Sequence, residues 1–78
     1  IPPIYIQIKD ILIEKINSGE LESGSQLPSE RDLSETYSIS RMTARNALTQ
    51  LVDSGYAYRV KGKGTFVSIP NYERDFVL

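Results

Sequence analysis

Cysteine and histidine are both missing from the sequence. Without cysteine the chain can form no disulfide and no thiolate metal site, and without either residue most nucleophilic and zinc chemistry is excluded. Carboxylates alone can serve a glycosidase, but that reaction needs a walled cleft, which a chain of 78 residues hardly builds. We therefore predict that the protein is not an enzyme and that it needs no metal ion or other cofactor.

Long apolar runs are missing as well. No run approaches the ~20 residues that cross a bilayer, and the N-terminus, IPPIYIQIKD, lacks the basic n-region of a signal peptide. We therefore predict a cytoplasmic protein with no membrane partner. The length allows one small domain, and a chain that starts without methionine and ends on an apolar FVL is expected to be a fragment of a longer protein.

The basic residues are concentrated in the middle of the chain, although the net charge is only −1. Residues 1–40 have three basic and seven acidic side chains, a net charge of −4, whereas residues 41–64 have five basic and one acidic side chain, a net charge of +4. Exposed charges are largely screened beyond about 8–10 Å, so the local cluster sets the local field. The cluster is either an ordinary solvated surface or a site for an anionic partner.

Two segments in the first half of the chain have the pattern of helices. Isoleucine and leucine recur at three- and four-residue spacing near the N-terminus, which predicts a helix over about residues 3–18. After a predicted turn region at 20–26, Ser29 and Asp32 have the spacing of a capping box, which predicts a short helix over 30–37.

A third helix is predicted to begin after Ser40, a good N-cap, and to end at Gly55. The connection between the second and third helices is about three residues long, which is typical of a helix-turn-helix. YAYRV (56–60) and TFVSI (65–69) then flank the glycine-containing loop KGKG (61–64), which predicts a β-hairpin. The inner face of the third helix is predicted to carry Ala44, Ala47, Leu48 and Leu51.

This order of elements predicts a winged helix-turn-helix domain over residues 1–69, mainly α with a small β-hairpin, built from three helices and a two-stranded wing. Such a fold brings the third helix and the hairpin loop to the same face, which accounts for the cluster of positive charge. Residues 70–78 are predicted to be a linker.

Residues 27–67, LPSERDLSETYSISRMTARNALTQLVDSGYAYRVKGKGTFV, closely resemble the DNA-binding domain of the GntR family of bacterial transcription regulators. Three motifs carry the resemblance at the expected separations: LPSER before the second helix, SRMTAR at the start of the third, and KGKGTFV in the wing. The N-terminal segment, with Tyr5 and Gln7 in a Y-x-Q pattern, is similar to the HutC-like subfamily. The resemblance extends over about residues 3–68.

The resemblance implies sequence-specific binding of double-stranded DNA by a transcription regulator, most often a repressor. It further implies that a homodimer of the full-length protein binds a near-palindromic operator, because operator symmetry mirrors the two-fold symmetry of the protein. Dimerisation and the binding of a small-molecule effector are expected to reside in a C-terminal domain that follows the linker.

Two arginines at the front of the third predicted helix are the leading candidates for DNA contact. Arg41 lies in the first turn and Arg45 follows one turn later. Recognition helices use their N-terminal residues on base edges, and arginine can bind guanine through O6 and N7. In the proteins that this sequence resembles, the matching arginines contact DNA; the alternative is that both are simply solvated. Met42 could touch bases or fold back over Tyr37 or Ile39.

Residues at the helix starts are weaker candidates. Ser29 and Ser40 are first of all helix caps, and their hydroxyl groups could also touch phosphate. Thr43 could contact a phosphate or a thymine methyl group. Arg31 resembles the family's second-helix arginine that contacts DNA; the alternative is a salt bridge to Glu30 or Glu35. Glu30 is expected to be structural.

The wing supplies the last group of candidates. Gly62 lets the backbone approach DNA closely, and Lys61 and Lys63 provide affinity for phosphates that does not depend on sequence. In the family that the chain resembles, this wing enters the minor groove; the alternative is a plain hairpin turn. Arg59 points outward and is a weaker phosphate candidate. Four hairpin residues are predicted to belong to the core rather than to stack on nucleobases: Tyr56, Tyr58, Phe66 and Val67.

Two other functions remain as alternatives to DNA binding. A winged helix that binds only protein would show no salt-dependent binding of DNA, and an enzyme fragment would be revealed by turnover. The clustered cations argue against the first and the missing histidine and cysteine against the second. The predicted DNA contacts are Ser29, Arg31, Ser40, Arg41, Thr43, Arg45, Asn46, Lys61, Gly62 and Lys63.

Overall fold

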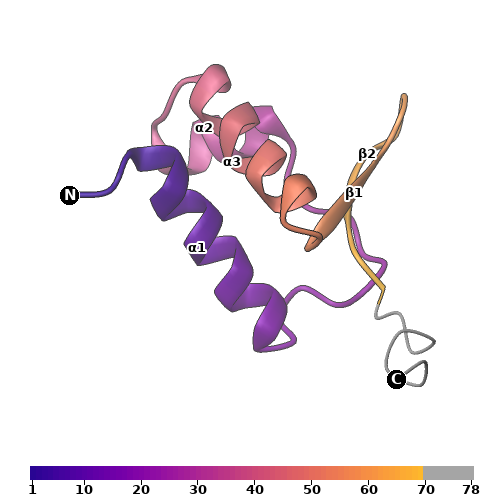
Figure 1. Cartoon of the computed structure of the whole chain (residues 1–78). Coiled ribbons are helices and arrows are strands. Elements are labelled where there is room, and N and C mark those ends of the chain that lie inside the picture. The colour runs from indigo at the N-terminus through magenta and orange to yellow at the C-terminus, as the bar shows by residue number, and fades with distance from the viewer. Residues whose placement is uncertain (70–78) are drawn as a thin grey trace.

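The computed structural model describes residues 1–69, and the predicted linker at 70–78 lies outside the described residues. Three helices and an antiparallel hairpin follow in the predicted order, so the winged helix-turn-helix is confirmed. The second helix has the predicted bounds, and the first is one residue shorter at each end than predicted. The elements are α1 Ile4–Asn17, α2 Glu30–Tyr37, α3 Arg41–Asp53, β1 Ala57–Val60 and β2 Gly64–Val67 (Figure 1).

Local hydrogen bonds determine both ends of α2. The Ser29 amide donates to Asp32 Oδ2 at 3.2 Å and the Asp32 amide donates to Ser29 Oγ at 3.0 Å, which is the predicted capping box. At the other end Ser38 has a left-handed backbone with φ of 54°, and the Ser34 hydroxyl donates to the Ile39 carbonyl at 2.6 Å. This short turn sets the direction in which α3 leaves α2.

The core joins the three helices to the hairpin. The four largest fully buried side chains each come from a different element: Leu12, Leu33, Leu51 and Val67. α1 packs against α3, and the two helices lie side by side in Figure 1. The predicted inner face of α3 is confirmed, because Ala44, Ala47, Leu48 and Leu51 are all buried.

A third extended segment pairs with the hairpin, where only a turn region was predicted. β1 and β2 are paired from Ala57 with Val67 to Val60 with Gly64. On the other edge of β2, the Leu27 amide donates to the Thr65 carbonyl at 2.8 Å. On the same edge the Val67 amide donates to the Ser25 carbonyl at 2.9 Å. The two bonds tie the segment before α2 to the wing, a contact between residues far apart in the sequence that no local pattern indicates.

The prediction that all four hairpin side chains named above lie in the core is wrong for Tyr58, which is 39% exposed, and for Phe66, which is only partly buried and lies outside the core cluster. Successive side chains of a strand point to opposite faces, so buried Ala57 leaves Tyr58 on the outer face. There it stacks on its cross-strand partner Phe66, with ring centroids 5.7 Å apart. Val67 is buried and Tyr56 packs against the core as predicted.

The start of β2 depends on a glycine, and its replacement should destabilise the wing. Gly64→Ala is expected to lower the free energy of unfolding by about 1–3 kcal/mol, because L-residues are strained at positive φ, here +129°. An added Cβ would also lie 2.6 Å from Gln26 Nε2. Urea denaturation followed by circular dichroism measures the loss.

Gly62→Ala is the matched control for this experiment. Gly62 also has positive φ, +77°, but nothing lies within 4 Å of the added Cβ. Gly62→Ala should lower the free energy of unfolding by about 1 kcal/mol, which is the cost of the left-handed backbone alone. Equal losses for the two variants would mean that Gln26 moves away from the added Cβ at no cost in stability.

Candidate nucleic-acid interface

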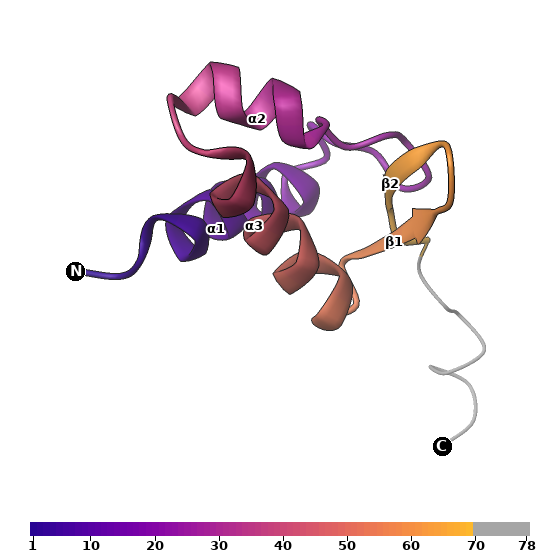
Figure 2. The same cartoon turned by 90° about the horizontal axis from the view of Figure 1, so that it is seen from above.

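α2, α3 and the hairpin loop form one side of the molecule. Figure 1 shows the free end of the hairpin on the same side as α2, and in Figure 2, seen from above, α3 lies in front of α1. Arg41, Lys61 and Lys63 are exposed and form no ion pair with any acidic side chain of residues 1–69. The structure therefore leaves three cations, from α3 and from the wing, available to an anionic partner.

Arg45 forms an ion pair with Glu30, which the sequence did not indicate. Its Nε donates to Glu30 Oε2 at 3.2 Å and its Nη2 donates to Glu30 Oε1 at 3.4 Å. The bond links α3 to the first turn of α2, so Glu30 has a structural partner, as expected, but on the neighbouring helix. The side chains are 57% and 33% exposed, and exposed pairs of this kind contribute only about 0–1 kcal/mol to stability.

Arg31 forms a salt bridge within α2, which the sequence left open as the alternative to DNA contact. Its Nε donates to Glu35 Oε2 at 3.0 Å, one turn later on α2. The side chain remains 72% exposed, so the two Nη groups of the guanidinium can still donate outward. The ion pair and a phosphate contact are compatible for this arginine.

The predicted hydroxyl contacts all act in helix caps. Ser40 Oγ accepts from the Thr43 amide at 3.0 Å and lies 2.9 Å from Thr43 Oγ1, while Ser29 caps α2 as described above. These bonds hold the first turns of α2 and α3 and orient their free amide groups outward. Asn46 and Met42 are exposed. Met42 is 59% exposed, so it does not fold back over the core.

Two further side chains connect the wing to the rest of the domain, and sequence reasoning missed both roles. Arg59, considered as a phosphate candidate, donates from Nη2 to Thr49 Oγ1 on α3 at 2.8 Å. Gln26 donates from Nε2 to the Lys63 carbonyl at 2.9 Å. Each bond joins residues that are at least ten positions apart in the sequence, so no local spacing could have revealed it.

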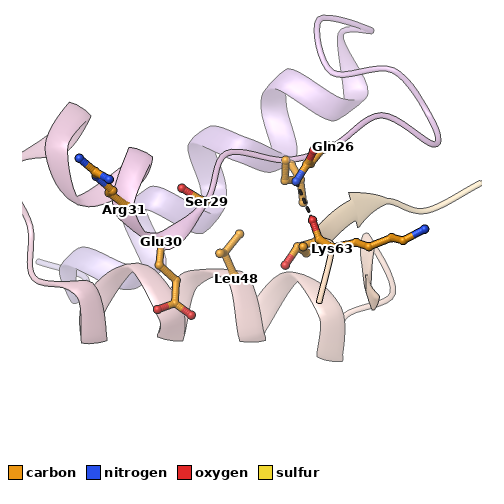
Figure 3. Close-up of a pocket in the computed structure, with 9 residues that line it drawn as sticks. Gln26, Ser29, Glu30, Arg31, Leu48 and Lys63 are labelled. Carbon is orange, nitrogen blue, oxygen red and sulfur yellow. Dashed lines mark hydrogen bonds between the residues drawn. The ribbon is translucent and has the colours of Figure 1, made fainter. Parts of the chain in front are cut away.

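A shallow groove lies between the start of α2 and the wing. It is lined on one side by Ser29, Glu30 and Arg31 and on the other by Lys63 and Gly64, with Gln26 at one end. Figure 3 shows the Glu30 carboxylate lying over α3, while the amino group of Lys63 extends away from the groove. The groove is thus an open surface feature with polar edges.

Neither a metal centre nor a membrane span is found in the part of the chain that the structure describes. Within residues 1–69, no three acidic side chains come together as metal ligands. None of the helices formed by these residues is long and apolar enough to cross a bilayer.

Known proteins with similar sequences include bacterial transcriptional repressors. The chain is 53% identical over 72 residues to the HTH-type transcriptional repressor NagR of Bacillus subtilis, an alignment that covers 92% of this chain and 30% of that protein. It is 41% identical over 68 residues to the histidine utilization repressor of Klebsiella aerogenes, covering 87% of this chain and 28% of that protein. The chain therefore spans about 30% of the length of these relatives.

Solved structures agree with this relationship. The crystal structure of AraR(DBD) in complex with operator ORX1 matches with a TM-score of 0.84 at 37% sequence identity, over 87% of this chain and 82% of that one. The family model of bacterial regulatory proteins of the gntR family matches residues 4–67. On this evidence the chain belongs to the gntR family of bacterial regulatory proteins, as its LPSER, SRMTAR and KGKG motifs predicted.

Proposed function

We propose that this chain is the sequence-specific, double-stranded DNA-binding domain of a bacterial transcription repressor, with α3 in the major groove and the loop 61–64 in the minor groove. The observation that carries the proposal is that α3 and the hairpin loop lie on one side of the molecule and present Arg41, Lys61 and Lys63 without ion-pair partners among residues 1–69. The AraR domain bound to an operator, which has the same fold, supports it.

The division of work follows from the chemistry of the side chains. An α-helix fits the major groove, where an arginine can donate two hydrogen bonds to guanine. Arg41 and Arg45, at the front of α3, take this role, and Asn46 and Thr43 lie beside them. The remaining contacts go to phosphates, which fix the position of the protein on the duplex; they come from Ser29, Arg31, Ser40, Lys61, Lys63 and the backbone at Gly62.

The full-length protein is proposed to act as a homodimer on a near-palindromic operator. The relatives are repressors that are about three times longer than this chain, since the alignments cover 30% and 28% of their lengths. Their additional length supports a C-terminal domain, reached through the linker at 70–78, that dimerises and binds a small-molecule effector. Such a regulator works on the bacterial chromosome, so we propose a cytoplasmic location and no catalytic activity.

Fluorescence anisotropy tests the proposal directly. Labelled duplexes enriched by selection from random DNA are compared with unselected duplexes at two salt concentrations. Tighter binding of the enriched duplexes, with an inverted repeat in their sequence, is the expected result. Weak and equal binding of both kinds of duplex would contradict sequence-specific recognition by this chain, and the absence of any salt-dependent binding would favour a protein-binding domain instead.

Lys63→Ala is expected to weaken binding to selected and unselected duplexes by the same factor. A lysine at the wing contacts phosphate, so its loss should lower the slope of log K against log salt by about one. The substitution leaves the backbone bonds of Lys63 to Val60 and Gln26 in place. Anisotropy titrations at four salt concentrations give the slope for each duplex.

Lys15→Ala is the control for the charge itself, because Lys15 lies near the end of α1 and pairs with Glu20. It removes the same charge and should leave the slope nearly unchanged. A larger effect on selected than on unselected duplexes for Lys63→Ala would show that this lysine reads bases or groove shape.

A further inference from the structure

We infer that Glu30 is a positioning residue for base recognition, which holds the guanidinium of Arg45 in the orientation that reads guanine. The inference rests on the proposed function and extends it to a side chain that contacts no DNA itself. It starts from the two hydrogen bonds that cross from α2 to α3, Arg45 Nε to Glu30 Oε2 at 3.2 Å and Arg45 Nη2 to Glu30 Oε1 at 3.4 Å.

The guanidinium has two edges that can each donate two parallel hydrogen bonds. Glu30 occupies the edge formed by Nε and Nη2. The other edge, formed by Nη1 and the second hydrogen of Nη2, remains available, and two donors are what O6 and N7 of guanine require. Arg45 can therefore bind Glu30 and a guanine at the same time, and the carboxylate fixes the plane of the guanidinium.

The position of Glu30 is unfavourable for the binding of phosphates. It lines the groove between α2 and the wing, next to Arg31 and across from Lys63. A carboxylate there repels DNA phosphates and so lowers affinity for every sequence. In the free protein the pair is exposed and adds little to stability, but in the complex water is excluded and the same pair becomes stronger. The geometry thus favours specificity at the expense of general affinity.

Restraining a long side chain before binding reduces the entropy lost when it is immobilised. For one such side chain the effect is worth about three- to tenfold in affinity. This gain appears only where Arg45 meets a guanine in a fixed orientation. On unselected DNA the fixed orientation brings no gain: a mobile Arg45 could turn to a phosphate, which the pair with Glu30 hinders, and the carboxylate is only a repulsive charge. Removing the carboxylate should therefore move the two affinities in opposite directions.

The test is the affinity of Glu30→Gln for a duplex enriched by selection with the unchanged chain and for a scrambled duplex of the same composition. The ratio of the two affinities should fall about three- to tenfold. Binding to the scrambled duplex should become tighter, with a salt slope steeper by up to about 0.9, because the released Arg45 becomes one more phosphate contact. Glu30→Asp keeps the charge but shortens the reach, and the same fall in the ratio is expected.

Glu35→Gln is the matched control, because Glu35 is also on α2 and pairs with Arg31. It removes the same charge and should change both affinities by the same factor. Repeating Glu30→Gln in the Arg45→Ala background should leave the ratio unchanged. The inference is overturned if Glu30→Gln and Glu30→Asp both keep the ratio, or if the ratio falls equally without Arg45. No preference by the unchanged chain would instead overturn the proposed function, and this inference with it.

Discussion

Arg45→Ala is expected to weaken binding to a selected operator duplex by about 1–3 kcal/mol, and to weaken binding to unselected duplex much less. Arg45 lies in the second turn of α3, where a recognition helix meets base edges. Its guanidinium is already held by Glu30 across the helix-turn-helix. Anisotropy titrations of both duplexes at one salt concentration measure the two losses.

Arg45→Lys separates the charge from the planar fork. Lysine carries the same charge but cannot make the two parallel hydrogen bonds of arginine. This variant should therefore bind unselected DNA as the unchanged chain does and lose most of the preference for the selected duplex. Equal losses on selected and unselected duplexes for Arg45→Ala would identify Arg45 as a phosphate contact, and base recognition would then fall to Arg41.

Leu51→Ala is expected to lower the free energy of unfolding by about 2–5 kcal/mol. Leu51 of α3 is 0% exposed and packs in the core that α3 shares with α1, α2 and the hairpin. Domains have about 0.05–0.15 kcal/mol of stability per residue, so a chain of 78 residues loses a large part of its total. Urea denaturation should show a lower midpoint with an unchanged slope, since the surface exposed on unfolding is nearly the same.

Met42→Ala is the surface control for this experiment, because it truncates an apolar side chain on the same helix that is 59% exposed. Substitutions at such sites usually change stability by no more than about 0.5 kcal/mol. Similar losses for Leu51→Ala and Met42→Ala would mean that Leu51 is not part of a packed core. The comparison also provides a stability reference for the binding variants on α3.

Much of the fold could be predicted because its signals lie within a few residues. Ser29 and Asp32 are three residues apart, and their reciprocal bonds start α2 where the capping box predicted. The apolar face of α3 was predicted from helical spacing, and the loop of the hairpin from its glycines. The segment at 24–27 was missed, because its pairing with β2 follows from the tertiary fold and not from its own pattern.

For the candidate site, the sequence predicted exposed cations on the third helix and the wing, but not the hydrogen bonds that the site residues form. Arg41, Lys61 and Lys63 are exposed on α3 and on the wing, as the motifs implied. The pairing of Arg45 with Glu30 could not be predicted, because the two residues are 15 positions apart and meet only through the packing of α2 against α3. Tyr58 was placed in the core since aromatic residues are commonly buried, but the alternation of β1 turns it outward.

The sequence by itself determined the order of helices and strands, the caps of α2 and α3, and the concentration of positive charge after residue 40. These depend on the backbone preferences and hydrogen bonds of near neighbours. Only the tertiary structure decided which polar groups meet: Arg45 with Glu30, Arg59 with Thr49, and Gln26 with the Lys63 carbonyl, at separations of 15, 10 and 37 residues. The physical reason is that packing of the core sets the distances between elements, and a side chain can bond only to a partner that this packing brings within reach.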